Sequence, residues 1–148
     1  MYVHIHTLIG RDYLYGRLEK LSPGTVPLFG LMTCHQMICH IGDLFRMAKG
    51  EMKAQEYGAI PAGEIHAMAR AGKTVPVPKG FDQQKGEGTQ PTDFKKDIDT
   101  LKQLIDEFNS LPADRIFSPH PYFGNMTKEE WLGLANYHIN YHLEQFGV

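Results

Sequence analysis

Apolar positions recur at helical spacing in two segments that also carry strong signals for a helix start. Thr33 is followed three residues later by a glutamine, and Thr127 is followed at the same spacing by a glutamate. In such a capping box the two side chains satisfy backbone N–H groups that the first helical turn leaves without a partner. Each segment ends near a glycine, the commonest residue just after a helix. We therefore predict helices over about 33–49 and 127–146.

The same periodicity predicts two further helices. One covers about 93–110 and stops before Leu111 and Pro112. Its apolar residues fall on one side: Phe94, Ile98, Leu101, Leu104, Ile105 and Phe108. The other has a weaker signal and covers about 6–21. Its apolar side is predicted from Leu8, Tyr13, Leu14 and Leu18.

Prolines and glycines interrupt every long period between about 51 and 91. Connections of this length inside a compact domain are usually functional or partly disordered, and we expect a short helix over about 62–71 to fill part of this one. We predict an all-α fold, a four-helix bundle in a single domain over 1–148, with one long crossover between helices 2 and 3. Such a crossover permits up-down-down-up wiring.

Composition and charge exclude several function classes. The 148 residues are 42% hydrophobic, which is enough to bury a core in one domain. The 15 basic residues form no stripe suited to a phosphate backbone, so nucleic acid is not an expected partner. No window approaches the roughly 18 apolar residues of a membrane span, so we expect a cytoplasmic protein without a membrane partner. Cys34 and Cys39 project about 140° apart on one helix, so no disulfide between them is expected.

Three histidines fall on the inward sides of two of these helices. On the last helix, positions at i, i+3, i+4 and i+7 spacing form one stripe: Trp131, Leu134, Ala135, His138, Ile139, His142 and Phe146. On the helix over 33–49 the corresponding stripe is Gln36, Met37, His40, Ile41, Leu44 and Ala48. We therefore expect His40, His138 and His142 to converge in one core.

A divalent metal ion would account for three buried imidazoles. Burying a polar ring without a partner costs roughly 1 to 3 kcal/mol, and one cation satisfies a nitrogen of all three rings at once. His138 and His142 lie on adjacent turns, about 6 Å apart, which suits metal–nitrogen bonds of about 2.0 to 2.1 Å. The alternative is that the three are core polar groups with hydrogen-bonded neighbours, because an HxxxH spacing alone is common in helices.

Neighbouring polar residues are further candidates for a role at this site. Asp43, one turn after His40, is a candidate catalytic base or a partner that orients a ligand histidine; the alternative is a solvated helix residue. His120 in SPHPYFGN is a candidate substrate contact or fourth ligand, and loop packing is its alternative. His35 is expected at the surface or an interface. Cys39 points about 100° away from His40 and is not counted as a ligand.

Several phrases of the sequence resemble an uncharacterised branch of the DinB/YfiT-like superfamily. They are PLFG, MTCHQMICHIGDLFRMAKGE, HPYFG and the closing TKEEWLGLANYHINYHLEQFG, which occur in this order over nearly the full length. The resemblance implies a DinB-like four-helix bundle, commonly a homodimer. It also implies a divalent metal held by one histidine of the second helix and an HxxxH pair on the last helix. These histidines correspond to His40, His138 and His142.

What the resemblance implies about activity is less specific. Characterised relatives in the superfamily are metal-dependent transferases and isomerases that use low-molecular-weight thiols, among them bacillithiol transferases and a mycothiol-dependent maleylpyruvate isomerase. A cation held by three neutral imidazoles would also lower the pKa of a bound thiol or water and make it a nucleophile. We therefore expect a thiol S-transferase or a hydrolase acting on a small molecule, with a low-molecular-weight thiol as the cosubstrate of a transferase. Zinc is the expected metal, with nickel, iron or manganese as alternatives. A binding module without turnover and a purely structural dimeric bundle are the other hypotheses.

Overall fold

The computed structural model describes residues 4–148, and within them the regular structure is helical apart from one isolated bridge between His120 and Gly124. The elements are α1 (Leu8–Leu18), α2 (Cys34–Lys49), α3 (Ala62–Arg70), the 3-10 helix η1 (Gln83–Lys85), α4 (Phe94–Ser110) and α5 (Lys128–Gln145). The predicted all-α class is confirmed, and α3 is the short helix expected in the crossover. Between residues 4 and 148 no helix has both the length and the apolar character that a membrane crossing requires.

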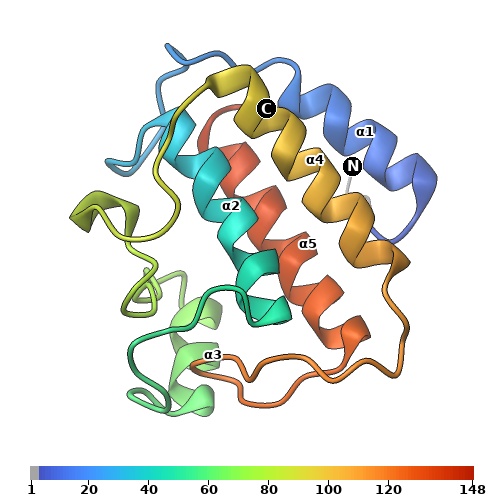
Figure 1. Ribbon diagram of the computed structural model, residues 1–148. Coiled ribbons are helices and arrows are strands. Elements are labelled where there is room, and N and C mark those ends of the chain that lie inside the picture. Colours follow the sequence, from blue (N-terminus) through green and yellow to red (C-terminus); the bar gives the residue numbers. More distant parts are fainter. Residues whose placement is uncertain (1–3) are drawn as a thin grey trace.

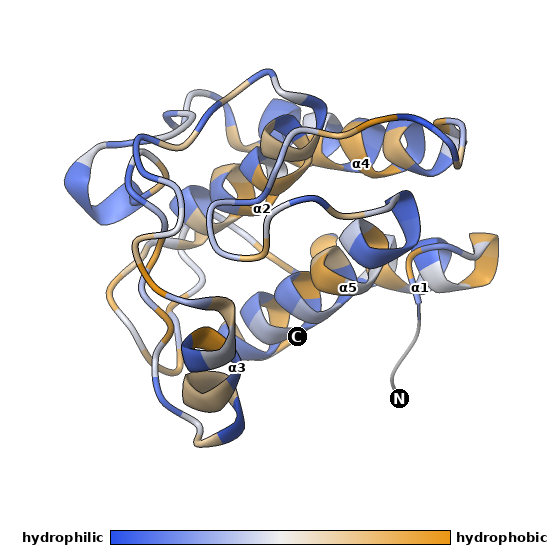
Figure 2. Cartoon of the chain, turned by 90° about the horizontal axis from the view of Figure 1, so that it is seen from below, coloured by the Kyte–Doolittle hydropathy of each residue, from blue (hydrophilic) through white to orange (hydrophobic). Residues whose placement is uncertain are grey.

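The four longer helices lie side by side in Figure 1, and α3 stands apart near the C-terminal end of α2. The colour order shows that α1 and α5 run in one direction and that α2 and α4 run in the other. Figure 2 shows these helices as two pairs, α2 with α4 and α5 with α1. Because α2 packs against both α4 and α5, it presents different sides to two helices. The largest fully buried side chains between the helices include Phe45, Phe108, Trp131 and Ile139.

Both predicted capping boxes are formed. The side chain of Thr33 accepts from the backbone N–H of Gln36, whose own side chain accepts from the backbone N–H of Thr33. Thr127 and the third residue of α5 pair in the same way. α2 ends at Gly50, whose φ of 79° is a left-handed conformation that glycine adopts without strain. Local interactions thus fix where the two histidine-bearing helices begin.

The inward side of α1 differs from the predicted one. Leu14 and Leu18 are buried, but Leu8 is 72% exposed and Tyr13 is 42% exposed. Leu8 lies six positions before Leu14, which places it about 240° around the helix and toward solvent. Arg17 also lies on the buried side, and its guanidinium donates to the side-chain oxygen of Asn140 on α5 at 2.6 Å.

Asp43 anchors the crossover to α2. Its buried carboxylate accepts from Thr89 N at 2.9 Å, from Thr89 Oγ1 at 2.6 Å and from Arg46 Nη1 at 2.9 Å. The alternative of a solvated helix residue was wrong, because the chain after η1 returns over this side of α2 and its N–H needs an acceptor. The crossover is thereby held against the helix that carries His40.

Candidate metal centre

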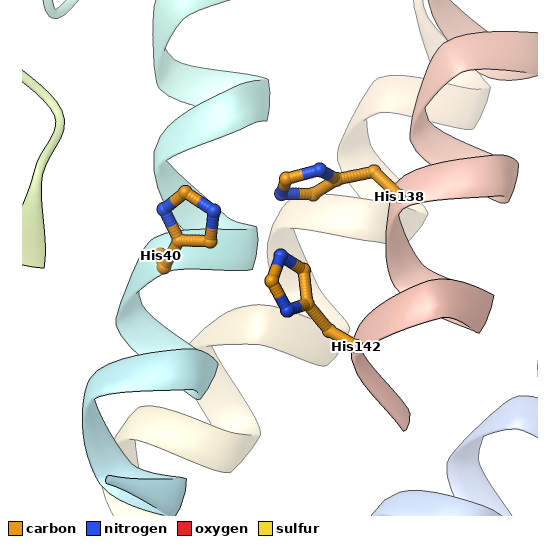
Figure 3. A group of neighbouring side chains, drawn as sticks. All are labelled: His40, His138 and His142. Atoms are coloured by element: carbon orange, nitrogen blue, oxygen red, sulfur yellow. The ribbon is translucent and has the colours of Figure 1, made fainter. Parts of the chain in front are cut away.

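The three histidines on the inward stripes meet in space. His40 projects from α2 toward His138 and His142, which project from α5 (Figure 3). The ring centroids are 4.8 Å apart for His40 and His138, 4.9 Å for His40 and His142, and 4.5 Å for His138 and His142. Each ring offers a nitrogen, and the three nitrogens lie within 4.8 Å of one another. We call these three residues the histidine triad.

Two rings of the triad are oriented by hydrogen bonds to the surrounding protein. Gln145 Nε2 donates to the Phe29 carbonyl at 3.0 Å, so Gln145 Oε1 is the acceptor that lies 2.8 Å from His142 Nδ1. His142 Nδ1 therefore carries the proton, and Nε2 keeps its lone pair. His40 donates to the backbone carbonyl of Phe81 in the crossover. Hydrogen bonds of this kind fix the tautomer and orientation of metal-binding histidines.

His138 differs from the other two because its Nε2 is buried and has no partner among residues 4–148. This nitrogen is buried and forms no hydrogen bond with any residue between 4 and 148. A buried polar atom without a partner costs about 1 to 3 kcal/mol. A ring that carries such an atom and adjoins two other imidazoles fits a ligand to an ion.

All three imidazoles of the triad are kept neutral. Burial lowers the pKa of His40 and of His142 to about 4. Burial also lowers the pKa of His138 well below its usual value, and the neighbouring rings of His142 and His40 add to the effect. Neutral imidazole is the form that binds a metal. With converging nitrogens, neutral rings and an unpartnered Nε2, the triad fits a divalent ion.

His120 lies near the triad, in the connection that leads into α5. Its Nδ1 accepts the backbone N–H groups of Tyr122 at 3.0 Å and Phe123 at 3.3 Å, so the ring proton is on Nε2. Burial lowers its pKa to about 4, and its ring adds to the lowering of the His138 pKa. Its centroid lies 4.7 Å from that of Phe123 and 5.5 Å from that of Trp131. His120 is thus packed within the loop, which agrees with the loop-packing alternative. Its ring is also fixed in the tautomer in which Nε2–H can donate.

Residues 65–147 match the model of a family described as a protein of unknown function, DUF1569. This span is more than half of the chain. The chain belongs to the DUF1569 family. No curated protein and no solved structure matches it. The DUF1569 match includes His120, His138 and His142 and begins after His40. The family description names no activity, so the function has to be inferred from the site.

Asp43 remains a predicted catalytic residue of this DUF1569 chain, without a contact that supports the role. Thr89 and Arg46 engage both of its carboxylate oxygens. Within residues 4–148 it shares no hydrogen bond with a ring of the triad. The acceptor next to His40 is the backbone carbonyl of Phe81, and the Asp43 carboxylate bonds to Thr89 and Arg46.

A second group of metal-binding side chains lies between α2 and α4 of the DUF1569 chain. His35 Nε2 is 2.6 Å from Asp97 Oδ2, and Cys39 Sγ is 3.9 Å from the same oxygen. We call these three residues the mixed cluster. His35 thus lies partly buried between α2 and α4 of the same chain. Cys39 points toward α4, and neither it nor Cys34 forms a disulfide, as predicted.

Three features of these sites were missed at the sequence level. Gln145 follows His142 by three residues on the same side of α5, and this i, i+3 spacing was an available signal. Phe81 acts through its carbonyl, which no side-chain pattern reveals. His35 and Cys39 are four residues apart, the same spacing as the α5 histidines, and that spacing could have identified the mixed cluster.

Proposed function

We propose that this chain is a DinB-like four-helix-bundle metalloprotein that binds a divalent ion through His40, His138 and His142. The observation that carries the proposal is the triad itself, in which three neutral rings converge and one buried nitrogen has no partner among residues 4–148. The side-by-side packing of the four longer helices supports the bundle. Zinc is our first choice because three imidazoles and one open position suit it. Nickel, iron and manganese are the alternatives.

We further propose that the chain is a metal-dependent thiol S-transferase or hydrolase acting on a small molecule. A divalent ion held by three neutral ligands supplies Lewis acidity that lowers the pKa of a thiol or a water and makes it nucleophilic. A low-molecular-weight thiol is the cosubstrate of the transferase reaction. His120 contributes a neutral Nε2–H donor, suited to an oxygen of the substrate. Gln145 and the Phe81 carbonyl hold the rings in place for this chemistry.

A bundle that binds a metal or a small molecule without turnover is the second candidate. It is favoured by the engagement of Asp43, because the nearest carboxylate on α2 is already occupied by Thr89 and Arg46. A purely structural dimeric bundle is the third candidate, and it requires the triad to remain without an ion.

We also propose that the chain forms a homodimer in the cytoplasm. The connection before α2 exposes large apolar side chains, with Val26 76%, Leu28 74% and Leu31 84% exposed. Phe29 in this connection lies with its ring 5.7 Å from that of Tyr141, which is also exposed, so the apolar surface continues onto α5. Light scattering of the purified protein measures the mass, and Leu31→Glu is expected to shift it toward the monomer. The reduced cysteines agree with a cytoplasmic location.

Metal analysis tests the proposed site directly. Protein purified without a histidine tag is expected to contain zinc or one of the alternative metals in stoichiometric amount. His138→Ala and His142→Ala should each lose that metal, while His6→Ala, an exposed histidine near the N-terminus, should keep it. A metal content far below stoichiometric, together with a thermal stability that added zinc does not change, would leave only the structural bundle.

Turnover is tested with the metal-loaded protein. Thiol-dependent loss of an electrophilic small molecule, or its hydrolysis, is measured across several thiols and metals. Activity that disappears in His142→Ala supports the enzyme. A loaded protein without turnover under any of these conditions supports the binding module instead.

A further inference from the structure

The mixed cluster repeats the arrangement of the histidine triad on another side of α2. His35 and Cys39 form a pair at i, i+4 on α2, and Asp97 faces them from α4. The nitrogen, sulfur and carboxylate oxygen that they offer lie within 4.8 Å of one another. In the triad, too, a pair at i, i+4 on one helix is completed by one residue from a facing helix. Both groups therefore place three ligand atoms around a common point.

The distances in the mixed cluster are close to those of a tetrahedral zinc site. Zinc bonds of about 2.0 to 2.3 Å to nitrogen, oxygen and sulfur place neighbouring ligand atoms about 3.3 to 3.6 Å apart. The distance from His35 Nε2 to Asp97 Oδ2 is 2.6 Å, and that from Cys39 Sγ to Asp97 Oδ2 is 3.9 Å. The first distance is shorter than the separation of neighbouring ligand atoms in a zinc site, and the second is longer. A small movement of the Asp97 side chain therefore brings both distances toward that separation.

An ion can reach the mixed cluster from solvent. The side chains of His35 and Asp97 are 19% and 18% exposed, and a small cavity borders Cys39 and Asp97. Arg46 also lines this cavity, but its guanidinium is paired with the Asp43 carboxylate at 2.9 Å. A water in this cavity would reach the cluster from the side of Cys39 and Asp97.

We propose that His35, Cys39 and Asp97 form a second metal site, for zinc or another divalent ion that accepts sulfur. As the metal–sulfur bond forms, the Cys39 thiol releases its proton to solvent. The His35 ring gives up the proton on Nε2 and takes one up at Nδ1, so that it binds as a neutral imidazole. Asp97 exchanges its hydrogen bonds from His35 and Cys39 for a metal–oxygen bond without a change of protonation.

The mixed cluster fills after the triad. Without an ion, Asp97 Oδ2 accepts from His35, from Cys39 and from the backbone N–H of Thr92 at 3.0 Å. An ion at the mixed cluster has to break the hydrogen bonds from His35 and Cys39 to Asp97 and to displace the thiol proton. An ion at the triad breaks no such bond and displaces no proton. The second site is therefore the weaker of the two.

Titration with cobalt chloride separates the two sites, because only the mixed cluster contains sulfur. A thiolate bound to cobalt absorbs strongly in the near ultraviolet, and imidazole ligands produce no such band. The full-length protein, kept reduced by a phosphine, is expected to develop this band after the triad has filled. Cys39→Ser should abolish it. Cys34→Ser, the matched control on the same helix, and His142→Ala, which removes a ligand of the triad, should both keep it.

The second site is overturned if no near-ultraviolet band appears at saturating cobalt, or if the band survives Cys39→Ser. If Cys39→Ser changes the far-ultraviolet circular dichroism, its fold is altered, and the site is tested with Asp97→Asn instead. The amide keeps the shape of the carboxylate but is a weaker ligand, so cobalt binding followed at this band should weaken at least about tenfold, and an unchanged affinity overturns the site. Because the band reports only on sulfur, none of these outcomes depends on the function proposed for the triad.

Discussion

The histidine triad and the mixed cluster are built alike but bonded differently. In the triad, His40 and His142 bond outward, to the Phe81 carbonyl and to Gln145. In the mixed cluster the bonds run inward, because Asp97 accepts from both of its partners. Proximity of ligand atoms is therefore common to both groups and does not show which of them needs an ion. The unpartnered nitrogen of the triad makes that distinction.

Protonation separates the two groups further. Burial keeps the rings of the triad neutral, so they can bind an ion without losing a proton. In the mixed cluster, burial and the nearby Asp97 charge raise the pKa of the Cys39 thiol to about 12. Burial works to raise the pKa of Asp97 as well, but the Thr92 N–H and His35 outweigh it and lower that pKa. An ion at the mixed cluster has to displace a firmly held proton, and one at the triad does not.

The largest expected difference between the two groups is in how the stability of the metal-free protein changes as the pH is lowered. The metal is first removed with a chelator. The pKa values of His40 and His142 are about 4 in the folded chain, against a usual value of 6.5. Between about pH 6.5 and 4, the unfolded chain therefore binds protons at these histidines that the folded chain does not. Their contribution to stability is complete above about pH 6.5 and is lost toward pH 4, about 3 kcal/mol for each histidine. Asp97 has a lowered pKa, so its contribution persists until the pH falls below its usual value of 3.8.

Urea denaturation across this pH range measures the effect. The free energy of unfolding should fall between about pH 6.5 and 4, and it should fall less steeply in a variant that lacks one ring of the triad. A flat profile over the range would show that the folded chain takes up these protons as readily as the unfolded chain, and so that the pKa values are not lowered by folding.

The unpartnered nitrogen of the triad can be removed outright with His138→Leu. In a buffer that contains a chelator, the variant should be as stable as the wild type or more stable by about 1 kcal/mol, because the substitution removes a buried polar group without a partner. When zinc is present at about a thousandfold above its dissociation constant, the variant should be less stable than the wild type by about 3 to 4 kcal/mol. Denaturation in both buffers gives the two values, with the exposed His6→Leu as the control that changes neither. An equal loss of stability in both buffers would contradict the role as a ligand.

The outward bonds of the triad are tested at Gln145. Gln145→Ala removes the acceptor that orients His142 and should weaken zinc binding about 10- to 100-fold, measured by competition with a chelating dye. Gln145→Glu keeps an acceptor at that position and should retain most of the affinity. If both variants weaken binding equally, Gln145 serves the fold through its bond to Phe29 and not the orientation of the ring.

The inward bonds of the mixed cluster should give the smallest effect. His35→Leu removes the hydrogen bond to Asp97 and should lower the free energy of unfolding of metal-free protein by about 1 kcal/mol. Zinc binding at the triad should be unchanged, as measured with the same dye. A loss of triad affinity in this variant would mean that the two sides of α2 are coupled.

Local patterns in the sequence predicted the helices and the convergence of the triad. Capping at Thr33 and Thr127 marks the helix starts, and 3.6-residue periodicity places His40 and the α5 pair inward. The supports of the triad depend on backbone paths, which such patterns do not reveal. The Phe81 carbonyl reaches His40 only because the crossover is pinned to α2. The mixed cluster likewise requires knowing which side of α2 meets α4.

The two carbonyls that hold the triad belong to connections rather than to helices. Phe81 lies in the crossover, and Phe29, which acts through Gln145, lies between α1 and α2. An ion that binds only when these rings are in place stabilises both connections through the same equilibrium. Occupancy of the triad is therefore expected to slow amide exchange and proteolysis in two surface segments that never touch the ion.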